Sequence, residues 1–273
     1  KMRANAWQPL VAAWLSAALI GWAWCHDGAC LQGGKHRAEP SPEPFLRECT
    51  LYSDNACCSE QDTQELAGSP ISQVDGVSWD RCGPLSPVCE GFLKRLACFY
   101  RCSPDAARWA HPHRPSAIQG VPLCLSFCQD WFEACKEDLI CAHNWVSDWE
   151  WGPQGNNCTR NCIPFQQMYT DSKDLCDSLW GDSFVAVDDA GQGDQSSCAC
   201  LSLGPSDRQV TEALRAQEGN PDELDTTKTG LPPAPCRRLP TLPPQARRSN
   251  NHRNALRKRS LFVEDVEGSG SGF

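Results

Sequence analysis

Cysteine constrains this chain more than any other residue type, because 19 of its 273 residues are cysteines. Cys25 lies at the expected end of a leader, so 18 would remain in the mature chain. They are spread along the sequence and include the neighbours Cys57 and Cys58, unlike the two short paired spacings of a zinc site. An even number of cysteines in a chain with a leader predicts nine disulfides, an oxidising compartment and no metal site.

Residues 1–25 have the composition of a secretory signal peptide. Lys1 and Arg3 precede an uncharged apolar run over residues 10–24, which is shorter than the roughly 20 residues of a membrane span. A short N-terminal anchor is the alternative interpretation. The C-terminal residues offer no hydrophobic stretch of the kind that a lipid-anchor signal requires. We therefore expect a secreted, extracellular protein without a transmembrane segment.

Charge and proline divide the rest of the chain into a folded unit, residues 26–202, and a tail, residues 203–273. The unit carries 12 basic and 25 acidic side chains, a net charge of −13, which argues against a nucleic-acid partner. The tail carries 11 basic and 9 acidic side chains, and eight Lys or Arg fall within residues 236–260. Few apolar residues and many prolines predict a mostly disordered tail that Cys236 staples to the body.

Apolar spacing predicts three helices and a mixed α+β domain. The first covers residues 87–102, with Ser86 as N-cap, Pro87 at the first position and one apolar face. The second is expected over residues 122–139, where three cysteines share one face. The third covers residues 172–180 and ends at Gly181. Frequent Pro and Gly elsewhere predict short elements only.

No catalytic motif stands out, so we expect no enzyme. The sequence has no G-x-S-x-G, no H-E-x-x-H and no phosphate-binding glycine loop. Aromatic residues instead lie beside cysteines, as with Tyr100 between Cys98 and Cys102 and Trp180 after Cys176. Two interpretations stay open at this point: these rings fill the core, or crosslinks hold them apart so that a flat heterocycle can stack between them.

Several motifs resemble the folate receptor family over about residues 30–200. They are ECTLYS (48–53), the Cys57–Cys58 pair, WDRCG (79–83), CFYRCSP (98–104), AARW (106–109), VPLC (121–124), CQDW (128–131), EAC (133–135) and CAHNW (141–145). Residues 141–150 and 178–184 resemble its riboflavin-binding members. The resemblance implies a disulfide-rich, folate-receptor-like single domain, a monomer that binds riboflavin between Tyr100 and Trp180. Five further tryptophans would line or support this pocket, the first three as structural residues: Trp79, Trp109, Trp131, Trp145 and Trp149.

The same resemblance implies how the cysteines pair. The pairs are Cys30–Cys57, Cys49–Cys98, Cys58–Cys102, Cys82–Cys162, Cys89–Cys135, Cys124–Cys200, Cys128–Cys176, Cys141–Cys158 and Cys198–Cys236. Sequence spacing alone would not choose among the many possible pairings.

Two other functions remain alternatives. Folate receptors carry a pterin-binding Asp about a dozen residues before the cysteine matching Cys82, where this chain reads SPIS (69–72), although a gap could bring Asp75 there. A carboxylate would give the pterin a charge-assisted hydrogen bond. The other alternative is an extracellular interaction protein without a ligand.

The tail and one sequon suggest further features. The basic run could be processed by a proprotein convertase at residues 257–259, or could bind a cell-surface receptor or acidic polymer. Asn157 begins an N-glycosylation sequon whose middle residue is Cys158.

Overall fold

The structure is a computed structural model that describes residues 29–189 and 200–218, with side chains up to residue 214. Three expectations fall outside these residues: the signal peptide over residues 1–25, the Cys198–Cys236 disulfide and the basic run over residues 236–260. Within the described residues, no helix is long and apolar enough to cross a membrane.

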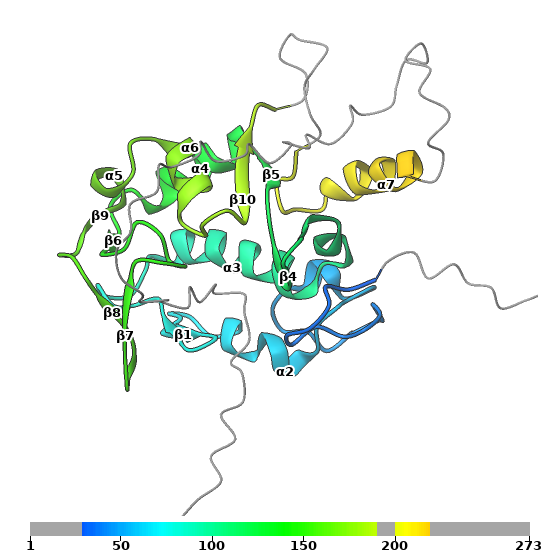
Figure 1. The fold of residues 1–273 in the computed structure, drawn as a ribbon, viewed down its shortest axis with the longest axis horizontal. Coiled ribbons are helices and arrows are strands. Elements are labelled where there is room, and N and C mark those ends of the chain that lie inside the picture. The colour runs from blue at the N-terminus through cyan, green and yellow to red at the C-terminus, as the bar shows by residue number, and fades with distance from the viewer. Residues whose placement is uncertain (1–28, 190–199, 219–273) are drawn as a thin grey trace, which may run out of the picture.

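The central helix is α3 (Pro87–Cys102), at the bounds that the sequence predicted. Ser86 accepts a hydrogen bond from the backbone N–H of Cys89, and Pro87 occupies the first turn, where its missing N–H leaves no bond unmade. The predicted apolar face is buried in the core. In Figure 1, α3 runs through the middle of the molecule, with α4 and α6 on one side and α2 and β1 on the other.

The second predicted helix is wrong at both ends. Its first residues form strand β5 (Val121–Cys124), which pairs in parallel with β10 (Phe184–Val187). Helix α4 then covers only Leu125–Cys135. Residues 136–138 of its expected last turn leave the helix and lead into β6 (Leu139–Ile140), antiparallel to β9 (Ile163–Pro164). Pairing with distant strands outweighs the local helical spacing in both places.

The remaining elements are short, and every sheet within residues 29–189 and 200–218 has two strands. The third predicted helix is α6 (Ser172–Ser178), which is capped by the Asp171 side chain. The others are η1 (Thr50–Tyr52), α2 (Glu60–Thr63), η2 (Gln64–Leu66), η3 (Pro104–Trp109) and α5 (Phe165–Met168), with the hairpins β1 (Gln73–Val74) and β2 (Val77–Ser78), β3 (Ala110–His111) and β4 (Arg114–Ile118), and β7 (Trp149–Gly152) and β8 (Gly155–Cys158). The predicted α+β class, with short strands among the helices, is confirmed.

Eight disulfides connect these short elements, and they are eight of the nine pairs that the resemblance implied. Cys49–Cys98, Cys58–Cys102 and Cys89–Cys135 all leave α3. Crosslinks of this kind stabilise a fold mainly by restricting the unfolded chain, by roughly 2–4 kcal/mol each. They compensate for sheets that are too small to be stable alone.

The chain after Leu203 departs from the expected tail, because α7 covers Asp207–Glu218. Its first turn is anchored by the Asp207 carboxylate, which accepts backbone hydrogen bonds from Ser202 and Leu203 at 2.9 and 2.7 Å. Leu214 is buried and Val210 packs against the core, so one apolar side of the helix lies on the body. The low overall hydrophobicity of the tail concealed this single amphipathic helix.

Candidate functional site

Four tryptophans from separate parts of the chain form one cluster. The ring of Trp145 lies 5.2 Å from that of Trp180, 5.9 Å from that of Trp79 and 6.0 Å from that of Trp149, measured between centroids. Trp79 also contacts Trp180 at 6.4 Å. All four side chains are buried. We call these four residues the tryptophan cluster.

Local backbone geometry places two of these rings. The backbone N–H of Trp145 donates to the carbonyl oxygen of Leu179 at 2.7 Å, which ties the Trp145 turn to the end of α6. Gly181 follows with φ of +66°, and a Cβ there would meet Val146 at 3.4 Å. Glycine therefore allows the chain to turn just beyond the end of α6, directly after Trp180.

Two neighbouring disulfides hold the other segments of the cluster. The four sulfur atoms of Cys82–Cys162 and Cys141–Cys158 all lie within 4.8 Å of one another. Cys158 also faces Trp149 across the β7–β8 hairpin. Because these thiols are oxidised, the group is a crosslink between the loops of the cluster rather than a set of metal ligands.

The indole N–H groups of three cluster members have no hydrogen-bond partner among the described residues. These buried nitrogens belong to Trp79, Trp145 and Trp149. Buried indole N–H groups normally find an acceptor, and an unmet buried donor costs roughly 1–3 kcal/mol. The cluster therefore combines flat apolar surface with donors suited to carbonyl or ring-nitrogen acceptors of a bound molecule.

The other two predicted tryptophans lie apart from the cluster. Trp109 packs against Phe99 at 6.0 Å, and Trp131 packs against Phe127 at 6.3 Å. These contacts agree with a structural role for both. Trp79 was also expected to be structural, but its ring contacts place it within the cluster.

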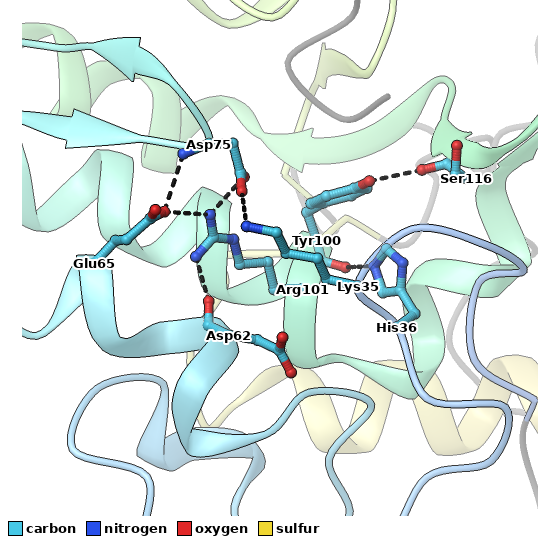
Figure 2. Close-up of polar contacts among 8 residues, drawn as sticks. All are labelled: Lys35, His36, Asp62, Glu65, Asp75, Tyr100, Arg101 and Ser116. Carbon is cyan, nitrogen blue, oxygen red and sulfur yellow. Dashed lines mark hydrogen bonds and ion pairs between the residues drawn. The ribbon is translucent and has the colours of Figure 1, made fainter. Parts of the chain in front are cut away.

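Tyr100 has different surroundings, which Figure 2 shows. Its hydroxyl donates to the backbone oxygen of Ser116 at 2.7 Å, and its ring meets His36 edge-on at 4.9 Å between centroids. Tyr100 is 6% exposed. The neighbouring Arg101 points into a polar network. At the end of α3, the aromatic side chain of Tyr100 and the charged side chain of Arg101 therefore point to different surroundings.

The network around Arg101 pairs each of its charges. Arg101, 4% exposed, donates to the Asp62 carbonyl oxygen and to the carboxylates of Asp75 at 2.5 Å and Glu65 at 3.3 Å. Lys35 contacts the other oxygen of Asp75 at 2.8 Å. Burial alone would raise the pKa of Asp75, but Arg101 and Lys35 together hold that pKa below its usual value.

No sequence pattern predicted a role for His36, Lys35 or Arg101. They come from an irregular segment and from the polar side of α3, so no periodicity connects them. The pair of glycines at Gly33 and Gly34 was the only signal, because it marks a turn immediately before Lys35 and His36.

Asn157 is exposed on β8, opposite Glu150 on the outer side of the hairpin. Its neighbours in the sequon, Cys158 and Thr159, are held by a disulfide and by a hydrogen bond to the Asp148 carbonyl at 3.1 Å. N-glycosylation at Asn157 stays a prediction, and this outer position would leave room for a glycan.

A separate cavity of about 470 Å³ lies between α7 and the body. Phe99 and Tyr52 contribute apolar surface, and Asp105 and Asp207 contribute carboxylates. Burial raises the pKa of Asp207, despite the backbone hydrogen bonds that it accepts. None of the predicted ligand-binding residues lines this cavity.

Comparison with known proteins agrees with this architecture. The sequence model of the folate receptor family matches residues 29–202. The chain belongs to the folate receptor family. Among its family relatives, a riboflavin-binding protein of Gallus gallus is 50% identical over 201 residues, which are 73% of this chain and 82% of that protein. A riboflavin-binding protein of Dromaius novaehollandiae is 46% identical over the same shares.

Family members named for folate are more distant. Folate receptor gamma of Homo sapiens is 33% identical over 162 residues, covering 57% of this chain and 66% of the receptor. The resemblance seen in the sequence motifs is thus confirmed, and this member of the folate receptor family is more similar to the riboflavin-binding proteins than to that receptor.

Proposed function

We propose that this protein binds riboflavin non-covalently and carries it outside cells. The relatives named for riboflavin binding are 50% and 46% identical to it, against 33% for a relative named for folate. No covalent chemistry is needed for this role, and we propose a carrier rather than an enzyme. The support from geometry is the tryptophan cluster, in which the indole N–H groups of Trp79, Trp145 and Trp149 have no partner among the described residues.

The chemistry of riboflavin suits this cluster. Its isoalloxazine ring is flat and has an apolar dimethylbenzene end. Its two carbonyl oxygens and the two ring nitrogens without hydrogen or side chain accept hydrogen bonds, while its imide N–H donates one. In the proposal, Tyr100 and Trp180 stack on the two faces of the ring, and the indole donors of Trp79, Trp145 and Trp149 face its acceptors. Aromatic stacking and satisfied buried donors would then both favour the complex.

Folate binding is the weaker alternative because the Asp75 carboxylate already has two partners. A pterin needs a carboxylate to accept hydrogen bonds from its amino and ring N–H groups. Asp75 was the candidate, but both of its oxygens are engaged by Arg101 and Lys35. Freeing it would leave the buried Arg101 without a principal partner.

An extracellular location is supported by the disulfides. Sixteen cysteines are oxidised in the described residues, and such density is typical of secreted domains and cell-surface ectodomains. We propose that the protein is a secreted carrier, in line with the leader expected over residues 1–25.

A titration tests the proposal. Dialysed protein is added to riboflavin while flavin fluorescence is followed, and folic acid is tested in parallel by tryptophan quenching. We expect stoichiometric flavin quenching that Trp180→Phe weakens and Trp109→Phe leaves unchanged. Riboflavin that stays fluorescent contradicts the proposal; quenching of tryptophan by folic acid would then favour folate, and no response to either would favour a protein partner.

A further inference from the structure

The irregular segment of residues 33–37 crosses the end of α3 at Tyr100. The imidazole of His36 meets the Tyr100 ring edge-on, with an interplanar angle of 88°. In Figure 2 this segment brings Lys35 and His36 to two neighbouring residues of α3, with His36 beside Tyr100 and Lys35 beside Arg101. The segment is 64 residues away from Tyr100 in sequence.

Two carbonyl groups hold the His36 ring in place. Its Nδ1 lies 3.0 Å from the Gly33 oxygen, and its Nε2 lies 3.0 Å from the Tyr100 oxygen. A neutral imidazole has one N–H and donates to one of these oxygens, whereas an imidazolium donates to both. In either state, at least one hydrogen bond holds the His36 ring, either to Gly33 of its own segment or to Tyr100 of α3.

Lys35 provides a second attachment beside the first. It pairs with Asp75 at 2.8 Å, and Asp75 pairs in turn with Arg101, the residue after Tyr100. The Arg101–Asp75 pair is shielded, with side chains 4% and 20% exposed, whereas the Lys35 side chain is 55% exposed. The shielded pair is worth more than a surface ion pair, and Lys35 adds a smaller contribution to it.

The path of the segment depends on two glycines. Gly33 and Gly34 have φ of +84° and +71°, and a Cβ on Gly34 would lie 3.2 Å from Nδ1 of His36. This turn places His36 over Tyr100. The chain is anchored on either side by the Cys30–Cys57 disulfide and by the Arg37 N–H, which donates to the Cys57 oxygen at 2.9 Å.

We propose that residues 33–36 act as a strap that holds the Tyr100 ring in its stacking orientation, with His36 and Lys35 as positioning residues. This proposal rests on the proposed function, because it assigns Tyr100 to the flavin. His36 acts on the tyrosine and need not touch the ligand. It thereby lowers the cost of ordering Tyr100 when riboflavin binds.

A double-mutant cycle tests the strap through binding. His36→Ala should weaken riboflavin binding about threefold to tenfold, the range of an aromatic edge contact, and Lys35→Met should weaken it less. In a Tyr100→Ala background, His36→Ala should have no further effect. The matched control is His113→Ala, an exposed histidine on the β3–β4 turn, which should leave binding unchanged. Equal losses in both backgrounds would overturn the proposal.

A second measurement needs no ligand and no variant of Tyr100. Nitration by tetranitromethane, mapped by mass spectrometry, reports how accessible each tyrosine ring is. Tyr100 should be nitrated faster in His36→Ala than in the wild type or His113→Ala, with Tyr169 as internal reference. An unchanged rate would overturn the strap. If wild-type protein leaves riboflavin fluorescent, the proposed function fails, and the nitration rates still decide whether the strap exists.

Discussion

The tryptophan cluster and the network around Arg101 differ in whether their buried polar groups have partners. In the cluster, the indole donors of Trp79, Trp145 and Trp149 are buried without partners among the described residues. In the network, the cations Arg101 and Lys35 pair with the carboxylates of Asp75 and Glu65. A polar group that already has a partner gains no hydrogen bond from a ligand. A buried donor without a partner is stabilised when a ligand brings an acceptor. The comparison supports the proposals that the cluster binds riboflavin and that the network holds its neighbour Tyr100 in place.

The largest loss of stability and of riboflavin binding is expected when a ring of the tryptophan cluster is removed. Trp180→Ala should lower the free energy of unfolding by about 3–5 kcal/mol, because it removes a large buried ring from a packed site. It should also abolish flavin quenching. Guanidinium denaturation with the disulfides intact measures the first effect. Trp109→Ala, a half-buried ring outside the cluster, is the matched control and should keep flavin quenching. Retained quenching in Trp180→Ala would contradict the role of the cluster.

Breaking the network around Arg101 should lower the free energy of unfolding by less than the loss of Trp180. Arg101→Met should destabilise the fold by about 3 kcal/mol, since it leaves Asp75 partly buried beside only one cation. Lys173→Met removes an exposed helical ion pair with Asp177 and serves as control, with an effect below about 0.5 kcal/mol. Urea denaturation compares the two. Similar small losses in both variants would show that the network does not stabilise the protein.

Acid should weaken the network before it affects the cluster, which carries no titrating side chain. The pKa of Asp75 is lower in the folded protein than its ordinary value of 3.8, so its contribution to stability is present above that value. It is lost as the pH falls below 3.8 towards the folded pKa. Melting temperatures between pH 5 and 2.5 should therefore fall less steeply in Asp75→Asn than in the wild type. Parallel curves would contradict this assignment.

The smallest effect concerns α7, which belongs to neither region. Arg208 pairs with Asp54 at 3.8 Å, and both side chains are exposed. Arg208→Ala should change stability by at most about 0.5 kcal/mol and leave riboflavin affinity unchanged. Thermal unfolding and the flavin titration check both statements. A clear loss of affinity would extend the binding region beyond the cluster to the cavity under α7.

Local patterns predicted local structure well. The spacing of apolar residues and the pair Ser86–Pro87 identified α3 at its observed bounds. The same reasoning failed at residues 121–124, because the partner strand β10 begins about 60 residues later and no local pattern announces it. The helical pattern of α7 was overlooked because its surroundings are polar and rich in proline.

The site could be predicted only in part, because its residues meet through the tertiary fold. Aromatic residues beside cysteines were visible in the sequence, but spacing could not show that Trp79 joins Trp145 and Trp180. The cysteine pairs that bring them together came from the family resemblance. His36 and Tyr100 come from an irregular segment and a helix, so their contact follows from disulfides and glycine turns rather than from periodicity.

The most direct test of the account follows the indole N–H groups themselves. Protein labelled with ¹⁵N-tryptophan gives one indole signal for each ring, and single Trp→Phe variants assign them. On adding riboflavin, the signals of Trp79, Trp145 and Trp149 should shift downfield as their donors gain acceptors. The indole N–H of Trp131 is also buried and has no partner in the part of the chain that the structure describes, but its ring packs against Phe127, so its signal should stay in place. Unmoved cluster signals in the presence of saturating riboflavin would contradict the central claim.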